Sequence, residues 1–343
     1  MTENSKIEWT HHTYNPWIGC QKVGPGCDHC YAETWDARFN GARWGANAER
    51  KRTSPANRNK PIIWNRKAMT AGERHRVFCA SLADVFDNHT SILPEWRADL
   101  WAMIRQTSHL DWMLLTKRPG NIARMLPPDW GDGYPNVWLG CTVVNQAEAD
   151  RDIPKLLAVP AKVRFLSMEP LLGPVDLTEV AVARPDLRAS VVLDVLRGTG
   201  GFDGPPGRID LVIVGGESGP HARPMHPDWA RGLRDQCQAA GVAFHFKQWG
   251  GWGAGSVLIT TGEPVFRQFR DFQQWVNKAP TWVNGGICLD ADGLQLKNGG
   301  DFMRARDAGK FPVTVMHRIG KKASGRILDG RTWDQMPGEP TND

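Results

Sequence analysis

The chain has 343 residues, of which 41% are hydrophobic and 23% charged, and this length suits one large domain of about 250 residues with an appendage. No apolar run approaches the roughly 18 residues that a membrane helix needs, which excludes a membrane-embedded protein. The formal net charge is only +5, and the N-terminus lacks the pattern of a secretory signal, so we expect a cytoplasmic protein without disulfides or a membrane partner.

Short apolar runs alternate with helical segments along the first two thirds of the chain. Nearly continuous apolar strands are typical of a parallel sheet that is covered on both faces. We therefore predict an α/β fold, a (β/α) parallel barrel of the TIM type, complete or partial, over 1–250, with an irregular extension packed on it over 251–343. The expected strands are 17–20, 77–81, 112–117, 137–142, 163–167, 211–215 and 243–247, and the expected helices are 94–106, 121–125, 146–157 and 227–240.

Two segments interrupt this alternation. Residues 43–67 form a basic loop that carries eight cations, Trp44 and Trp64, and only Glu49 as an acid. Such a loop can follow a phosphate backbone, although a solvated surface excursion explains it equally well. Residues 178–208 predict an inserted helix and a glycine-rich loop that covers the pocket.

Three of the seven cysteines, Cys20, Cys27 and Cys30, lie within eleven residues and are followed directly by Tyr31. Three soft sulfur ligands leave the fourth position of a metal site open, which suits a reactive iron–sulfur cluster better than a closed structural site. The other four cysteines are scattered, and we interpret them as buried apolar residues: Cys79, Cys141, Cys237 and Cys288.

Polar residues repeatedly follow the predicted strands. Catalytic residues of (β/α) barrels lie at the carboxyl ends of the strands, so we expect these side chains to share one pocket. Each also has a structural interpretation, since Asp84 can cap a turn, Lys117 can pair with Glu169 or Glu217, and Gly215-Gly216 can serve backbone geometry. The strand ends also hold Arg118, Asn145, Ser167, Gly219, Gln248 and Trp249. The candidates are Ser81, Asp84, Thr116, Lys117, Thr142, Glu169, Gly215, Gly216, Glu217, Ser218 and Lys247.

The cysteine cluster ahead of a predicted barrel resembles the radical S-adenosylmethionine (radical SAM) superfamily. Two residues separate its last two cysteines and an aromatic residue follows, although six residues separate the first two where the superfamily usually has three. The strand endings at Ser81, Asp84 and Thr116-Lys117 are similar to the spore photoproduct lyase-like branch. Nearly the whole chain looks like a phage and prophage family assigned to this superfamily, through Trp9-Thr10, Asn15-Pro16-Trp17-Ile18-Gly19-Cys20, 215–219, 246–250 and 330–337.

This resemblance implies that Cys20, Cys27 and Cys30 bind a 4Fe-4S cluster whose open iron holds S-adenosylmethionine. It implies an electron donor such as flavodoxin or ferredoxin, and a 5′-deoxyadenosyl radical that abstracts hydrogen from the substrate. Lys117 and Glu217 are then the catalytic candidates beside the cysteines. The candidates for holding the cofactor are Tyr31, Ser81, Asp84, Thr116, Thr142, Glu169, Gly215, Gly216, Ser218 and Lys247. We expect the backbone amides of the Gly215-Gly216 turn to be free to bind it.

Two questions stay open at this point. A structural zinc site in a nucleic-acid-binding protein, with His29, His11 or His12 as the fourth ligand, also satisfies the cysteine spacing. The basic loop and the tryptophans, with Trp249 and Trp252 as candidates to stack on a base, favour modification or repair of a nucleic-acid base or nucleotide, but a peptide or small molecule remains an alternative. The oligomeric state is not indicated.

Overall fold

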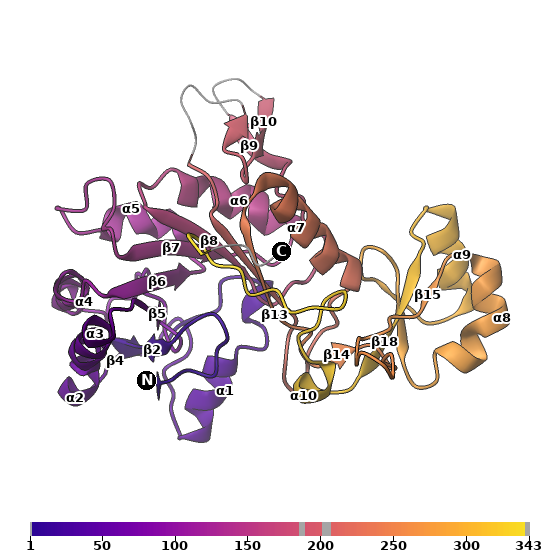
Figure 1. Cartoon of the computed structure of the whole chain (residues 1–343), viewed down its shortest axis with the longest axis horizontal. Helices are drawn as coiled ribbons and strands as arrows, with labels where there is room; N and C mark the ends of the chain where they lie inside the picture. The colour runs from indigo at the N-terminus through magenta and orange to yellow at the C-terminus, as the bar shows by residue number, and fades with distance from the viewer. Residues whose placement is uncertain (1, 185–188, 201–206, 340–343) are drawn as a thin grey trace. The chain divides into compact units, whose positions relative to one another are not determined.

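One eight-stranded sheet carries the predicted α/β alternation in the computed structural model, which describes residues 2–184, 189–200 and 207–339 (Figure 1). The four pairs from β2 to β8 are parallel, and β1 adds an antiparallel edge. The sheet is curled and mostly parallel, which fits a partial α/β barrel and not a complete TIM barrel. Its order is β1 (Thr2–Glu3), β2 (His12–Tyr14), β5 (His75–Cys79), β6 (Leu110–Thr116), β7 (Val137–Thr142), β8 (Val163–Met168), β12 (Leu211–Gly215) and β13 (Ala243–Gln248).

Three of the four predicted helices have the predicted limits: α4 (Pro94–Gln106), α6 (Gln146–Leu157) and α7 (Pro227–Ala240). The fourth is a 3-10 turn, η2 (Pro119–Asn121), followed by the short α5 (Ile122–Met125). Helix α4 buries Leu100, Trp101 and Ile104 on one face, as a helical period requires. Helix α7 ends at Gly241, which takes the left-handed conformation with φ +65° that glycine accepts without strain.

The first strand was predicted wrongly at 17–20. The strand that joins the sheet is β2 (His12–Tyr14), whereas β3 (Trp17–Ile18) pairs antiparallel with β4 (Lys51–Arg52) in a separate small sheet. Pro16 lies between them, and it has no amide hydrogen for a central ladder. Cys20 therefore lies several residues beyond the strand end.

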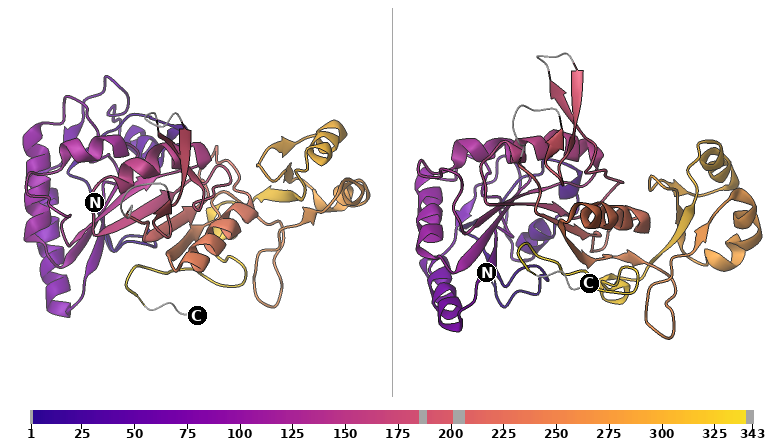
Figure 2. Two further views of the ribbon diagram at one scale, coloured as in Figure 1. Left: turned by 90° about the horizontal axis from the view of Figure 1, so that it is seen from above. Right: turned by 45° about the horizontal axis from the view of Figure 1, so that its top comes forward.

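The inserted helix within 178–208 was also predicted wrongly. Strands β9 (Val180–Arg184) and β10 (Ala189–Asp194) form an antiparallel pair that β11 (Thr199–Gly200) extends, in a sheet separate from the main one (Figure 2). Both segments contain several β-branched valines, which favour strands over helices. The predicted glycine-rich loop lies partly at 201–206, outside the described residues.

Residues beyond 251 are more regular than predicted. A five-stranded sheet forms from β14 (Trp252–Gly253), β15 (Gln268–Phe269), β16 (Ile287–Leu289), β17 (Gln295–Leu296) and β18 (Val313–Arg318). A core that includes Phe269, Cys288 and Phe302 holds it against α8 (Phe272–Trp282) and α9 (Gly299–Asp307). Most of these strands have only two or three residues, which is too short for a visible period.

The chain divides into two compact units. The first contains Met1–Val143, Ala147–Ser167 and Thr178–Val212, and the second contains Val144–Gln146, Met168–Leu177 and Ile213–Asp343. The predicted boundary at residue 250 stays a prediction. Among the described residues, no helix has the length and apolar character that crossing a membrane requires.

His226 joins α7 to β18 in the second unit. Its Nδ1 accepts a hydrogen bond from the Asp228 amide at 3.2 Å, so its Nε2 donates to the Thr314 hydroxyl at 2.6 Å. Burial lowers the pKa of His226 to about 4, because a charged imidazole loses its hydration there. The folded protein therefore contains the neutral ring.

We expect the folded state to lose stability as the pH falls from 6.5, the usual pKa of histidine, towards 4. The unfolded chain takes up this proton first, so the contribution of His226 is complete above pH 6.5 and amounts to up to about 3 kcal/mol. Urea unfolding at pH 7 and 4.5 measures this loss. The variant His226→Asn keeps a capping side chain and should show a smaller loss; an equal loss would contradict the assignment.

Candidate functional site

The segment from Cys20 to Cys30, the cysteine segment, is fixed by backbone hydrogen bonds at its start. The amide of Cys20 donates to the Arg43 carbonyl at 3.2 Å, and its carbonyl accepts from Gly45 at 2.9 Å. The preceding amide, of Gly19, donates to the Leu82 carbonyl just beyond β5 at 3.0 Å. Cys20 is thus held beside the carboxyl end of a central strand, although it does not end a strand itself.

Beyond this anchor the segment makes a 3-10 turn, η1 (Pro25–Cys27), and Cys30 is the N-cap residue of α1 (Tyr31–Arg38). Cys27 is buried, and Cys20 and Cys30 are partly exposed. All three are free thiols, as are the other four cysteines, which are buried as predicted.

Arg118 contacts the first cysteine directly. Its Nη1 lies 3.5 Å from the Cys20 Sγ, and its Nη2 donates to the Gln21 carbonyl at 2.9 Å. Only 8% of the Arg118 side chain is exposed, so the guanidinium is committed to these partners. The sequence places Arg118 among the strand-end residues, directly after Thr116-Lys117 at the end of β6, but it does not indicate this role beside Cys20.

Asp84 holds that arginine in place. Its Oδ2 accepts from Arg118 Nη1 at 2.8 Å and from the Lys117 amide at 3.1 Å. Its Oδ1 accepts from the Thr116 hydroxyl at 2.8 Å and from the Phe86 amide at 2.9 Å. Four donors within the protein surround this buried carboxylate, so Asp84 and Thr116 position the end of β6 and Arg118.

A second buried ion pair lies beside the first. Arg50 Nε donates to Asp87 Oδ2 at 2.9 Å, and neither side chain has any exposed surface. Arg50 also donates to the Gly45 carbonyl at 3.0 Å, which fixes the stretch that pairs with Cys20. The other oxygen of Asp87 has no hydrogen bond in the described residues and lies 3.8 Å from Arg118 Nε.

These contacts change the interpretation of one cation of the basic loop. Arg50 is a buried structural residue and is not available to follow a phosphate backbone, whereas Arg52 pairs with Asp99, whose side chain is 63% exposed. Trp64 is 1% exposed within α3 (Lys60–Ala71), where it stacks on His12. The sequence does not show these two pairs, because the acidic partners of Arg50 and Arg52 lie 37 and 47 residues away. That the other cations follow a phosphate backbone stays a prediction.

The electrostatic surroundings of Cys20 favour its neutral form. Burial and the charge of Asp84 raise the pKa of this thiol and Arg118 lowers it, and together they bring it to about 11. The Sγ also lies 3.6 Å from the Gln21 carbonyl, an acceptor for its proton. Without a bound cation, Cys20 is therefore a thiol at neutral pH.

Tyr31 and Ser81, both predicted cofactor contacts, are brought together. The Tyr31 hydroxyl donates to the Ser81 carbonyl at 2.6 Å, and Asn15 Nδ2 donates to the Ser81 hydroxyl at 3.0 Å. Tyr31, Trp35 and Phe39 follow one another at helical spacing and are 60%, 38% and 66% exposed. We call these three side chains the aromatic face of α1.

Lys117 and Thr142 line a small space under the cysteine segment. Lys117 Nζ lies 3.3 Å from the Thr142 hydroxyl, so neither predicted carboxylate partner holds this amine. The space measures about 10 Å³, which is the size of one water molecule. Gly24 closes it against Glu148, where a Cβ atom would lie 2.6 Å from the carboxylate.

The remaining candidates lie in the second unit. Glu169 Oε1 pairs with Lys247 Nζ at 2.7 Å, and Glu217, which is 7% exposed, pairs with Arg223 Nη2 at 2.7 Å. Ser218 is exposed. Glu169, a predicted cofactor ligand, and Glu217, a predicted catalytic residue, are thus each paired with a cation.

Gly216 does not present a free amide, contrary to the prediction for the glycine turn. Its N–H donates to the Gln248 carbonyl at 2.9 Å, and a Cβ atom at this position would lie 1.9 Å from the Trp249 carbonyl. A close approach of two backbones explains the glycine. The indole of Trp249 is buried and donates to the Ile327 carbonyl at 2.8 Å, so it is not available to stack on a base.

A family model for a protein of unknown function, DUF5131, matches residues 4–337. The chain belongs to the DUF5131 family. A comparison with curated proteins found no match, and a comparison with solved structures found none either. The family description assigns no activity, so the geometry of the site must carry the functional argument for this DUF5131 protein.

The cysteine segment offers three free thiols and forms no disulfide. Thiolate sulfur is a soft ligand, so these residues suit a metal that prefers sulfur. Within the part of the chain that the structure describes, no three His, Cys, Asp or Glu side chains are already grouped as a metal site. A metal centre at these cysteines would require the three side chains to move together, as happens where metal binding and local folding are coupled.

The variant Asp84→Asn should lower the free energy of unfolding of this DUF5131 protein by about 3 kcal/mol or more, because it leaves the buried guanidinium of Arg118 without its carboxylate. Denaturant unfolding measures the change. The matched control is Asp99→Asn, which breaks the Arg52 pair at a carboxylate that is 63% exposed, and it should cost less than about 1 kcal/mol. Equal losses would contradict a special role for Asp84.

Proposed function

We propose that this DUF5131 protein is a radical SAM enzyme, in which Cys20, Cys27 and Cys30 bind a 4Fe-4S cluster. The observation that carries the proposal is three free thiols on one short segment, fixed beside the carboxyl end of β5 in a curled, mostly parallel sheet. Catalytic groups gather at that end of the strands in α/β barrels. When bound, the cluster and S-adenosylmethionine supply a 5′-deoxyadenosyl radical, using an electron from a flavodoxin- or ferredoxin-type donor.

The chain's own residues position this centre. Arg118 donates to the Cys20 sulfur at 3.5 Å, and Asp84 fixes the guanidinium that does so. Hydrogen bonds to cluster sulfurs are one of the means by which proteins tune the reduction potential. Tyr31 and Ser81 lie beside the segment and are the candidates for contact with S-adenosylmethionine.

The zinc alternative receives less support from its proposed fourth ligands. His12 Nε2 lies 3.2 Å from His75 Nδ1, and its ring stacks on Trp64 at a centroid distance of 4.4 Å. His11 Nδ1 accepts from the Arg76 amide at 2.9 Å. Both rings are engaged at the start of β2, whereas the cysteine segment follows the strand, and only the exposed His29 lies within the segment.

A nucleic-acid base or nucleotide remains the proposed substrate, supported by the aromatic face of α1. Tyr31 directly follows Cys30, and the rings of Trp35 and Phe39 lie 4.9 Å apart with large exposed areas. Exposed aromatic side chains in a series are the platforms on which single-stranded nucleic acids stack their bases. This face replaces the buried Trp64 and Trp249 as the candidate for base contact.

Anaerobic reconstitution with iron and sulfide tests the proposed cluster. The parent protein should bind about four irons and four sulfides and cleave S-adenosylmethionine to 5′-deoxyadenosine when a reductant is present. The triple variant Cys20→Ala, Cys27→Ala, Cys30→Ala should lose both the iron and the cleavage. Cys141→Ala, which removes a buried thiol from β7, should retain both. A colourless parent protein with one zinc ion would overturn the proposal.

The variant Trp35→Ala, Phe39→Ala should weaken binding of a single-stranded oligonucleotide by roughly tenfold or more, because each stacked base contributes about 1–3 kcal/mol. Fluorescence anisotropy of a labelled strand at constant salt measures the affinity. The control is Ile62→Ala, Ile63→Ala, which removes exposed apolar side chains from α3 and should leave the affinity unchanged. If both double variants bind like the parent, the aromatic face is not the base-binding surface.

A further inference from the structure

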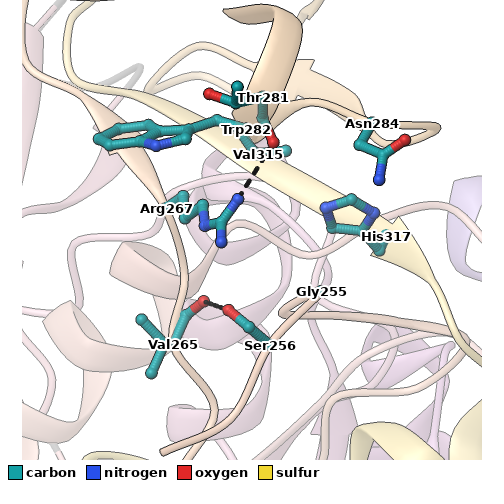
Figure 3. A pocket seen from close by; sticks show the side chains of 9 residues that line it. All are labelled: Gly255, Ser256, Val265, Arg267, Thr281, Trp282, Asn284, Val315 and His317. Carbon is teal, nitrogen blue, oxygen red and sulfur yellow. Dashed lines mark hydrogen bonds between the residues drawn. The ribbon is translucent and has the colours of Figure 1, made fainter. Parts of the chain in front are cut away.

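A polar pocket of about 230 Å³ lies in the second unit, within the region of the five-stranded sheet (Figure 3). Its residues belong neither to the cysteine segment nor to the aromatic face. Strand β18 contributes Val315 and His317, and the C-terminal end of α8 contributes Thr281 and Trp282. The lining is Gly255, Ser256, Val265, Arg267, Thr281, Trp282, Asn284, Val315 and His317.

The pocket carries a positive charge that its walls do not neutralise. Arg267 donates from Nη1 to the Thr281 carbonyl at 3.3 Å, and this contact steadies the guanidinium. No Asp or Glu lines the pocket, and within the described ranges no ion pair joins Arg267 to a carboxylate. Its other N–H donors can therefore serve a bound anion.

His317 is built into the opposite wall. A Cβ atom at Gly255 would lie 2.3 Å from its Cδ2, and one at Gly286 would lie 2.8 Å from its Cε1. The two glycines thus leave room for the imidazole, and their close approach restricts the orientation of the ring. Burial, together with the charge of Arg267, lowers the pKa of His317, so the ring is neutral and offers one N–H donor at neutral pH.

The donors surround one space from several directions. Figure 3 shows Arg267 between the Trp282 indole and the His317 ring, with Asn284 beside the histidine and Ser256 across the pocket. The Ser256 hydroxyl donates to the Val265 carbonyl at 3.4 Å, so the donors that remain are a guanidinium, an imidazole and an amide. Together these three suit an anion with three or more oxygens better than a flat carboxylate. The Trp282 ring stacks on Phe269 at 5.3 Å, which makes it a rigid wall.

We propose that this pocket binds a phosphate ester, with Arg267 as the main anchor and His317 and Asn284 as further donors. Its volume is below the roughly 300 Å³ at which pockets for drug-sized ligands begin, so it holds a phosphate with little more than its attached sugar. That the phosphate belongs to a mononucleotide or to a strand of nucleic acid rests on the substrate proposed above. This inference is independent of the proposed cluster, because none of its residues binds the cluster.

Isothermal titration calorimetry of the full chain without metal tests the pocket with three probes: inorganic phosphate, a 5′-mononucleotide and a single-stranded oligonucleotide. We expect saturable binding of at least one probe, and the tightest probe identifies the source of the phosphate. Arg267→Gln should weaken it by roughly tenfold or more, because a charge-assisted contact is lost. His317→Gln, which changes a different wall, should also weaken it.

The matched control is Arg270→Gln, which removes an exposed guanidinium three residues away that does not line the pocket. It should bind the probes like the parent. No saturable binding of any probe overturns the proposal, and so does an equal loss in Arg267→Gln and Arg270→Gln. Thermal unfolding of each variant without a probe shows whether it is folded.

Discussion

The candidate site depends on the buried carboxylate of Asp84. Its two oxygens accept from the Thr116 hydroxyl, the amides of Phe86 and Lys117, and the Arg118 guanidinium, which together join the segment after β5 to the end of β6. Through Arg118 the same carboxylate fixes the Cys20 sulfur and the Gln21 carbonyl. A buried charge pair of this kind is costly to break, so it specifies one position for the start of the cysteine segment.

Arg50 extends this constraint into the basic loop. It pairs with Asp87 and donates to the Gly45 carbonyl, and Gly45 in turn donates to Cys20. Arg50, one of the eight cations that suggested a nucleic-acid surface, therefore stabilises the start of the cysteine segment from inside the protein. Composition cannot distinguish a buried, paired arginine from one that binds phosphate. The difference is visible only when the carboxylate partner is known.

The sequence predicts the elements with strong periodicity and misses those without it. Strand β7 and helices α4, α6 and α7 begin and end where their apolar periods predict. Strand β2 was missed because His12–Tyr14 is three residues long and polar at two positions, although all three are buried. Arg118 was expected at a strand end, but its role was not predicted, because its contact with Cys20 spans 98 residues of sequence and only the register of β5 and β6 brings the two together.

The neighbours of Cys20 have opposite effects on its ionisation, and a bound cation would favour the thiolate. A guanidinium can only donate, so Arg118 requires an electron pair on the Cys20 sulfur, which a thiolate offers better than a thiol. Burial and the negative charge of Asp84 nevertheless keep the proton on that sulfur. A metal ion reverses this balance, because it displaces the proton and adds positive charge where the two carboxylates, Asp84 and Asp87, already lie. Metal binding at these cysteines should accordingly release protons and weaken as the pH falls, while Arg118 and Asp84 keep the positions that they have without metal.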